Sequence, residues 1–85
     1  MRVYIPTPLR SYTKQSVVQA DGATLAAMFD DLNRQFPGIR FRVINEQDEI
    51  REHIKVFVNQ SVAENLAAPL QSGDDVRIVT AISGG

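Results

Sequence analysis

Residues 70–85, LQSGDDVRIVTAISGG, carry the pattern that decides the fold of this 85-residue chain. Ser72-Gly73-Asp74 is a turn signal. After it, Val76, Ile78, Thr80 and Ile82 alternate with the residues between them over residues 75–82. Alternation with a period of two predicts a strand with one buried face. This strand leads directly into Ser83, Gly84 and Gly85, although glycine loses more conformational entropy on ordering than any other residue.

Three more segments predict partners for this last strand. Residues 2–9 begin with strand-like alternation, and their two prolines favour an edge or a loop in the second half. Residues 15–20 predict a second strand, which would form a hairpin with the first through a loose turn at residues 10–14. Residues 54–59, IKVFVN, predict a third strand.

A helix is expected between the hairpin and the third strand. Asp21-Gly22 predicts a turn, and Thr24 is suited to cap the helix because its hydroxyl can accept a hydrogen bond from a first-turn amide. Pro37-Gly38 predicts the end of the helix. The apolar residues of this segment fall on one helical stripe, which we assign to the core: Leu25, Met28, Phe29, Leu32 and Phe36.

Two segments lack a regular pattern. Within residues 39–53, we expect Phe41, Val43 and Ile44 to anchor a short strand or an irregular segment. The charged run at residues 46–52 predicts a solvated loop or a short helical turn. Residues 60–70 are expected to cross the surface, and their apolar anchors would be Val62, Leu66 and Leu70.

The order of elements is strand, strand, helix, strand, strand. Such an order builds a mixed sheet with one main helix packed across it, in which the first and last strands can be central neighbours. This is the plan of an α+β, β-grasp (ubiquitin-like) fold. We expect a single domain at residues 1–82 and a flexible C-terminal tail at residues 83–85.

Composition excludes several classes of function. The net charge is −1, so the chain lacks the basic surplus of a nucleic-acid-binding protein. It has no cysteine, which excludes disulfides, thiolate metal sites and thiol nucleophiles and fits a cytoplasmic location. No apolar run is long enough to span a membrane.

No catalytic or metal-binding constellation is visible either. His53 is the only histidine, and it is expected to be a surface residue beside a strand. The carboxylates of Glu46, Asp48, Glu49 and Glu52 lack the regular spacing and the glycine of a calcium loop, so we assign them to a solvated face.

The chain resembles the ThiS/MoaD family of ubiquitin-like sulfur carriers over nearly its whole length. The most specific parts of the resemblance are the Gly73-Asp74-x-Val76 turn and strand and the terminal Gly84-Gly85. The turn at Asp21-Gly22 and the sequence Phe36-Pro37-Gly38 support it. Ala81 is a departure, because many members have a proline in this region.

The resemblance implies a mechanism. An activating enzyme similar to the ubiquitin-activating class would adenylate the Gly85 carboxylate, and a sulfur donor would then replace AMP to leave a thiocarboxylate. A biosynthetic enzyme of the molybdopterin, thiamine or cysteine type would accept the sulfur. The chain would be a protein cosubstrate, or a small subunit of a sulfur-transferring synthase, and not an enzyme by itself. It would bind no cofactor, since ATP and magnesium would belong to the activating partner.

A docking surface is expected near the tail. If Val56 and Val58 face the helix, Phe57 lies outward and joins Val79 and Ala81 in an apolar patch of the kind that marks partner sites. The same alternation also allows Phe57 to lie in the core.

Three residues beside this patch complete the candidate surface. Ile82 and Ser83 lie close enough to the tail in sequence to be recognised by the partner. Arg77 either contacts an acidic partner surface or is simply solvated.

Two other functions stay open on the sequence. The chain could be a ubiquitin-like modifier that is joined through Gly85 to lysines of target proteins. It could also be a non-covalent β-grasp interaction domain with an incidental tail, in which case removal of Gly84 and Gly85 would change nothing.

Overall fold

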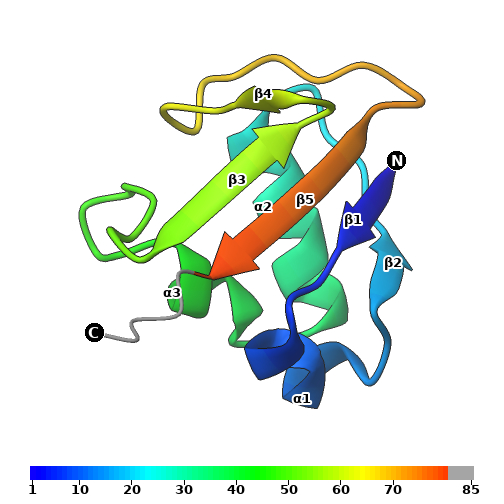
Figure 1. Cartoon of the computed structure of the whole chain (residues 1–85), viewed down its shortest axis with the longest axis vertical. Coiled ribbons are helices and arrows are strands. Elements are labelled where there is room, and N and C mark those ends of the chain that lie inside the picture. Colours follow the sequence, from blue (N-terminus) through cyan, green and yellow to red (C-terminus); the bar gives the residue numbers. More distant parts are fainter. Residues whose placement is uncertain (81–85) are drawn as a thin grey trace.

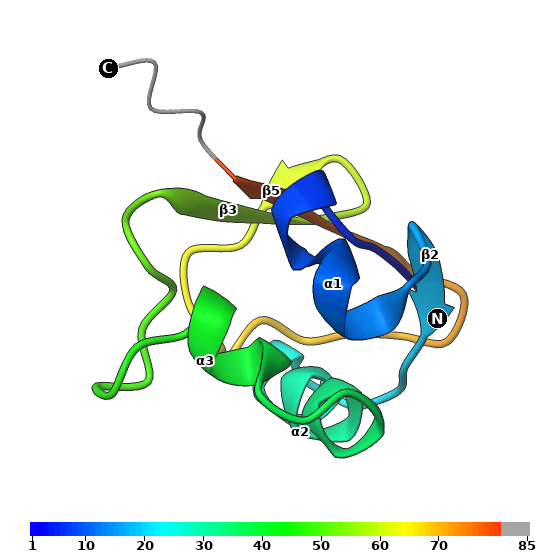
Figure 2. The ribbon, with the colours of Figure 1, turned by 90° about the horizontal axis from the view of Figure 1, so that it is seen from below.

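The computed structural model describes residues 1–80. The expectations for Ala81, Ile82, Ser83, Gly84 and Gly85, and for the domain boundary after residue 82, lie outside the described residues. Figure 1 shows the described part as a sheet in front of its helices, and Figure 2 shows the helices on one face of that sheet. The elements are β1 (Arg2–Tyr4), the 3-10 helix η1 (Thr7–Leu9), α1 (Arg10–Thr13), β2 (Val17–Gln19), α2 (Leu25–Gln35), α3 (Ile39–Val43), β3 (Ile54–Val58), β4 (Ser61–Val62) and β5 (Asp75–Thr80).

Over residues 1–80 the sheet has the strand order β2-β1-β5-β3-β4, with β5 at its centre. β5 pairs in parallel with β1 and antiparallel with β3, while β1 and β2 form an antiparallel hairpin. The prediction that the first and last strands are central neighbours is therefore confirmed. With α2 packed across it, this mixed sheet has the β-grasp arrangement that the element order predicts (Figure 1).

The main helix, α2, forms as its sequence predicts. The Thr24 hydroxyl accepts a hydrogen bond from the Ala27 amide at 3.3 Å and caps the first turn. The apolar stripe faces the sheet. Leu25, Met28, Phe29 and Leu32 are fully buried, and Phe36 is half-buried against them.

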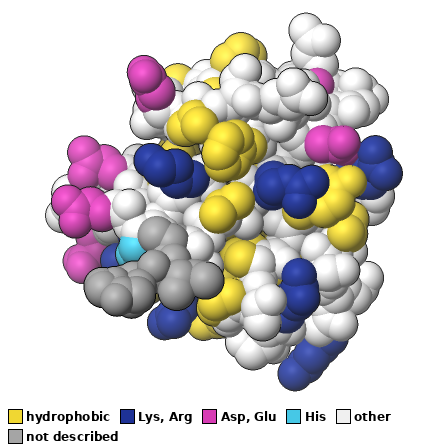
Figure 3. All heavy atoms as spheres, viewed as in Figure 1, with side chains coloured by type: hydrophobic (Ala, Val, Ile, Leu, Met, Phe, Trp, Pro, Cys, Tyr) yellow, Lys and Arg dark blue, Asp and Glu magenta, His cyan; other side chains and the backbone are white. Residues whose placement is uncertain are grey.

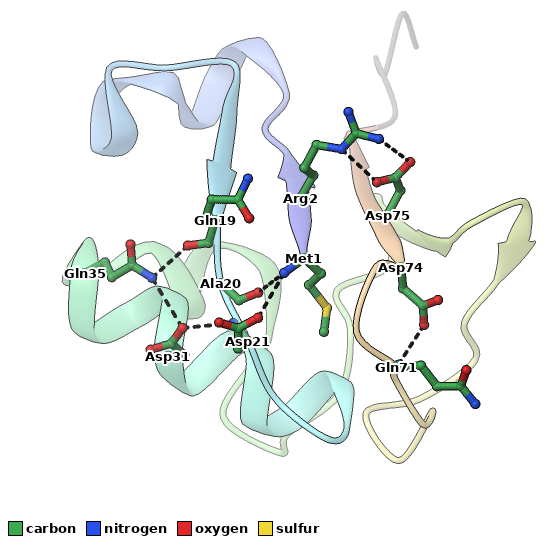
Figure 4. Close-up of polar contacts among 10 residues, drawn as sticks. All are labelled: Met1, Arg2, Gln19, Ala20, Asp21, Asp31, Gln35, Gln71, Asp74 and Asp75. Carbon is green, nitrogen blue, oxygen red and sulfur yellow. Dashed lines mark hydrogen bonds and ion pairs between the residues drawn. The ribbon is translucent and has the colours of Figure 1, made fainter.

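Polar contacts tie α2 to the hairpin (Figure 4). Asp31 accepts a hydrogen bond from the Asp21 amide at 3.0 Å, and the Met1 amino group donates to the Asp21 carboxylate at 2.9 Å. One turn further along the helix, the Gln35 side chain donates to the Gln19 carbonyl of β2 at 2.9 Å and to the Asp31 carboxylate at 3.3 Å. The C-terminal half of α2 is therefore fixed to the edge strand β2 and to the segment that follows it.

The turn before β5 explains the Gly73-Asp74 sequence. Gly73 has a φ of +92°, a conformation that glycine adopts without steric cost. One carboxylate oxygen of Asp74 accepts the Gln71 amide at 2.8 Å (Figure 4), and the other accepts the Asn59 side chain at 3.2 Å. This pair of residues therefore sets both the turn and the position at which β5 begins beside β3.

The connection within the hairpin is not the loose turn that we expected. Residues 7–13 form η1 and α1, with Pro8 in the first turn of η1, where its missing amide hydrogen costs nothing. Leu9 and Thr13 are buried, and Lys14 ends α1 in the left-handed conformation with a φ of 61°. Burial of Leu9 against the core therefore turns this segment into a cover for one end of the sheet (Figure 2).

The strand or irregular segment expected around residue 41 is wrong, because residues 39–43 form α3. Ile39 and Val43, four residues apart, are fully buried on one side of this short helix, which packs on α2, and Ile44 is buried after it. Phe41, in contrast, is 54% exposed. The charged run that follows is a solvated loop, the first of the two forms that the sequence predicts.

Residues 60–70 follow the surface and are held by Leu66 and Leu70, which are buried as expected. The assignment of Val62 as a third anchor is wrong. Val62 lies in β4 and is 48% exposed.

In the described part of the chain, no helix has the length and apolar character needed to cross a membrane.

Candidate partner-binding surface

The two faces of β5 differ in burial. Val76 and Ile78 are 0% and 2% exposed and point toward the helices, whereas Arg77 and Val79 are exposed on the opposite face. Side chains of neighbouring residues alternate across a strand, so Arg77 and Val79 share the outer face of the sheet. The candidate residues of β5 are therefore available to a partner.

The register of β3 places Phe57 on the same face. Val56 is fully buried and pairs with Ile78, while Phe57 pairs with Arg77. Phe57 is half-buried among its neighbours on the sheet and is not part of the buried core. The structure thus decides between the two positions that the sequence left open for Phe57.

Other side chains extend this outer surface beyond the residues that the sequence indicates. Val62 of β4 pairs with Phe57, Lys55 pairs with Val79, and Tyr4 of β1 pairs with Arg77. We call the resulting surface the outer patch and define it by Tyr4, Lys55, Phe57, Val62, Arg77 and Val79. Figure 3 shows hydrophobic side chains gathered with Lys and Arg side chains over the sheet.

The charge of the outer patch is positive. The Arg77 guanidinium lies over the Tyr4 ring, 4.3 Å from its centroid, which is a cation–π contact. Within residues 1–80, neither Arg77 nor Lys55 forms an ion pair. At the start of β5, Asp75 is paired with Arg2 at 3.1 Å (Figure 4). The uncompensated positive charge therefore lies toward the end of β5 from which the chain continues to Gly85.

A shallow groove runs along β1 and β5 next to the outer patch. Its lining includes Tyr4, Pro6, Val17, Val79 and Thr80, and the charged side chains that line it are Arg10 and Arg77. The groove reaches Thr80, the last described residue. A partner that contacts the outer patch therefore meets an apolar surface with positive charge beside the C-terminal end of β5.

The remaining candidates of the sequence do not gather into a site. His53 and the four carboxylates of Glu46, Asp48, Glu49 and Glu52 are all exposed, as expected. Within the described residues, no group of three or more His, Asp or Glu side chains could hold a metal ion. The Asp48 carboxylate instead forms an ion pair with the Arg40 guanidinium at 3.1 Å.

Reasoning from the sequence missed Tyr4, Lys55 and Val62. The signal that could have found Tyr4 and Lys55 is the alternation of each with a buried neighbour, Val3 and Val56. Which strands lie side by side was also needed, because Tyr4 and Arg77 meet only through the parallel pairing of β1 with β5.

Comparison with known proteins supplies the family context. Residues 3–85 match the model of the ThiS family. The sulfur carrier protein CysO of Mycobacterium tuberculosis (strain ATCC 25618 / H37Rv) is 35% identical over 89 residues, which cover 98% of this chain and 96% of that protein. The protein of the same name from Mycobacterium bovis shows the same identity and coverage.

Solved structures agree with this result. A chain of the Amycolatopsis orientalis BexX/CysO complex superposes with a TM-score of 0.91 at 34% identity, covering 99% of this chain and 98% of that chain. The crystal structure of Mycobacterium tuberculosis CysO gives 0.90 at 32% identity, with 95% and 98% covered. SAMP1 from Haloferax volcanii gives 0.85 at 26% identity, with 100% and 98% covered.

Proposed function

The chain belongs to the ThiS family, and on this basis we propose that it is a sulfur-carrier protein whose Gly85 carboxylate becomes a thiocarboxylate. The observation that carries the proposal is the family match over residues 3–85, together with 35% identity to a sulfur carrier along nearly the whole chain. The sulfur would be used in the biosynthesis of a cofactor or metabolite. In this role the chain is a protein cosubstrate and not an enzyme.

Conversion of the carboxylate to a thiocarboxylate takes two steps. The Gly85 carboxylate attacks the α-phosphate of ATP, so that an acyl-adenylate forms and pyrophosphate leaves. A sulfur nucleophile then attacks the carbonyl carbon, and AMP leaves with the bonding electron pair. ATP and magnesium are held by the activating enzyme, since Mg²⁺ is usually bound by a few carboxylates together with substrate phosphates. This chain supplies the acyl group alone.

We propose that Gly84 and Gly85 are the reactive tail. The attacking oxygen must come within about 3–3.5 Å of phosphorus in a productive geometry. Residues without side chains pass a narrow active-site channel with the least steric hindrance and can follow the backbone path that it requires. Ser83 and Ile82 precede the two glycines in the sequence, and we propose that the partner also recognises these two residues.

The outer patch is the proposed docking surface. Ordering a tail that contains two glycines costs conformational entropy, which binding of the folded domain must offset. Phe57 and Val79 offer apolar contact area, and Arg77 is held in place by its contact with Tyr4. A partner with an apolar surface and acidic groups complements this arrangement. Ala81, outside the described residues, completes the proposed surface.

The proposed partners are an adenylating enzyme of the ubiquitin-activating kind and a sulfur-accepting biosynthetic enzyme. A related chain is known in a complex, the BexX/CysO complex of Amycolatopsis orientalis, which supports association with a second protein. A role as the small subunit of a sulfur-transferring synthase would use the same tail. The cytoplasmic location and the absence of nucleic-acid and membrane partners remain predictions.

The test is the intact mass of the protein after incubation with ATP, magnesium, a sulfide source and host extract. We expect a gain that matches the replacement of one oxygen by one sulfur. The control is a chain that lacks Gly84 and Gly85, which should gain nothing. An unchanged mass of the full chain, with the activating enzyme shown to be working, would overturn the proposal.

A second candidate is a ubiquitin-like modifier joined through Gly85 to lysines of targets. Similarity to archaeal SAMP1 supports this candidate, because that protein is called a small archaeal modifier protein. The identity is 26% and the TM-score is 0.85. Isopeptide-linked products in the same incubation would identify this function. If neither product forms and deletion of Gly84 and Gly85 leaves the function of the protein unchanged, the chain is a non-covalent interaction domain.

A further inference from the structure

A second groove lies on the helix side of the sheet, where β5 ends. Its floor is apolar and includes Leu9 and Ile54. Its rim carries Phe41 and Arg42 of α3 together with Arg51 and His53 from the segment before β3. We call it the basic groove. It also reaches Thr80, which pairs with Ile54, so it approaches the end of β5 from the face opposite the outer patch.

Arg51 is held in place at the rim of the basic groove. Its Nε donates a hydrogen bond to the Phe41 carbonyl at 2.8 Å, and its guanidinium lies 4.5 Å from the centroid of the Phe41 ring. The two terminal nitrogens of this guanidinium form no hydrogen bond within residues 1–80. A planar guanidinium with free terminal nitrogens matches a carboxylate in a bidentate geometry, and less side-chain entropy is lost because Arg51 is already ordered.

The charge of the basic groove has one sign. Its ionisable lining residues are Arg42, Arg51 and His53, and no carboxylate of the described residues lines it. Glu52 and Glu64 line an adjoining hollow beside β4, which shares Arg51 and Ile54 with the basic groove. Within the described residues, the side chains of Arg42 and Arg51 form no ion pair.

The basic groove also exposes apolar surface. Phe41 is 54% exposed even with Arg51 over one side of its ring. The apolar floor beside it is suited to one inserted aliphatic or aromatic side chain. An apolar floor with a cationic rim therefore complements a segment that carries an apolar residue between acidic ones.

We propose that the basic groove binds an acidic segment of a protein partner, with one apolar side chain against Leu9, Ile54 and Phe41 and a carboxylate on Arg51. The identity of the partner as an enzyme that takes up the tail rests on the proposed function. The binding chemistry of the groove does not. Because the outer patch and the basic groove approach the end of β5 from opposite faces, one partner that uses both holds the chain on either side of the strand that precedes Gly85.

A peptide supplies the first test. The probe is acetyl-Asp-Glu-Leu-Glu-Asp-amide, titrated into the ¹⁵N-labelled full chain and followed by amide chemical shifts. We expect saturable shifts at Phe41, Arg42, Arg51, His53 and Ile54, and weaker binding as salt is added. A peptide with lysine and arginine in the acidic positions should cause none. Absence of saturable shifts at these amides, or shifts confined to the outer patch, would overturn the inference.

Variants separate binding from folding. Arg51→Gln should weaken peptide binding at least fivefold. Because this change also removes the hydrogen bond to Phe41, the second variant is Arg42→Gln. Arg42 lines the groove, is exposed and makes no side-chain hydrogen bond within residues 1–80. Arg42→Gln should weaken binding about threefold. The matched control is Arg34→Gln on the exposed side of α2, which should leave binding unchanged. Equal affinity in all three variants would contradict the inference.

The intact-mass test distinguishes the two proposals. If the full chain gains sulfur but the acidic peptide does not bind, the inference about the basic groove fails and the proposed function stands. If the peptide binds at the groove and no sulfur is gained by the full chain, the proposed function fails, and the groove remains a site for an acidic protein segment.

Discussion

Replacement of Val56 or Val79 by alanine removes the same two methyl groups from opposite faces of the sheet. Val56 is 0% exposed and packs in the core, whereas Val79, on the neighbouring strand, is 37% exposed. Two buried carbon groups at about 0.8 kcal/mol each give about 1.6 kcal/mol of lost transfer free energy. The cavity left at residue 56 raises the expected loss of stability to about 2–3 kcal/mol. At residue 79 water fills the space, so we expect a loss below about 1 kcal/mol.

The assay compares stability with function in the same two variants. Urea denaturation followed by circular dichroism gives the free energy of unfolding. An unchanged slope of this free energy against urea concentration shows that the two-state comparison between variants is valid. The rate of sulfur gain, measured by intact mass at limiting carrier concentration, gives kcat/KM of the activating enzyme. We expect Val79→Ala to lower kcat/KM about fivefold, equivalent to about 1 kcal/mol of lost binding. Val56→Ala, where folded, should leave it nearly unchanged.

Two results would refute this reasoning. Equal destabilisation by the two substitutions would contradict the assignment of Val56 to the core and Val79 to the outer face. An unchanged kcat/KM in folded Val79→Ala would show that the outer patch does not bind the activating enzyme, even if sulfur is still loaded on Gly85.

The other predictions concern two glycines that lie outside the helices and strands, and the effect of pH on stability. A Cβ on Gly22 would lie 2.4 Å from the Met28 nitrogen, so Gly22→Ala should cost about 3 kcal/mol in urea denaturation. Gly73→Ala meets no atom within 4 Å and strains only a φ of +92°, so it should cost about 1–2 kcal/mol, and a larger loss than at Gly22 would contradict this account. The Asp21 amide and the Arg34 guanidinium hold the pKa of Asp31 below its ordinary value of 3.8. The ionised form of Asp31 therefore stabilises the fold above about pH 4, and this contribution is lost as the pH falls through the folded-state pKa. Asp31→Asn should be less stable than the original chain near pH 7, and the difference should shrink toward about pH 3. A difference that is independent of pH would argue against this role of Asp31.

Local signals predicted the elements that depend on neighbours in sequence. The stripe of α2 and the alternation of β5 each repeat over several turns or pairs of residues, so burial of one face was expected from the pattern. Thr24 and Gly73-Asp74 supplied the start of the helix and the turn before the last strand through hydrogen bonds to nearby backbone. These features required no knowledge of long-range packing.

The sequence of a short apolar segment did not distinguish a strand from a helix. Ile39, Phe41 and Val43 alternate as in a strand, but Ile39 and Val43 are also four residues apart, as on one side of a helix. Five residues do not distinguish these periods. Packing against α2 selects the helix, and it leaves Phe41 outside, at the rim of the basic groove.

The sequence by itself determined the order of the main helix and of the four principal strands, the family resemblance and the residues proposed for the chemistry, Gly84 and Gly85. Only the tertiary structure decided which side chains share a surface. A period of two shows that a strand has two faces, but it does not show which strand lies next to it. Parallel pairing joins Tyr4 to Arg77, and antiparallel pairing places Phe57 between Arg77 and Val62. The outer patch exists because these backbone hydrogen bonds connect residues that are far apart in the chain.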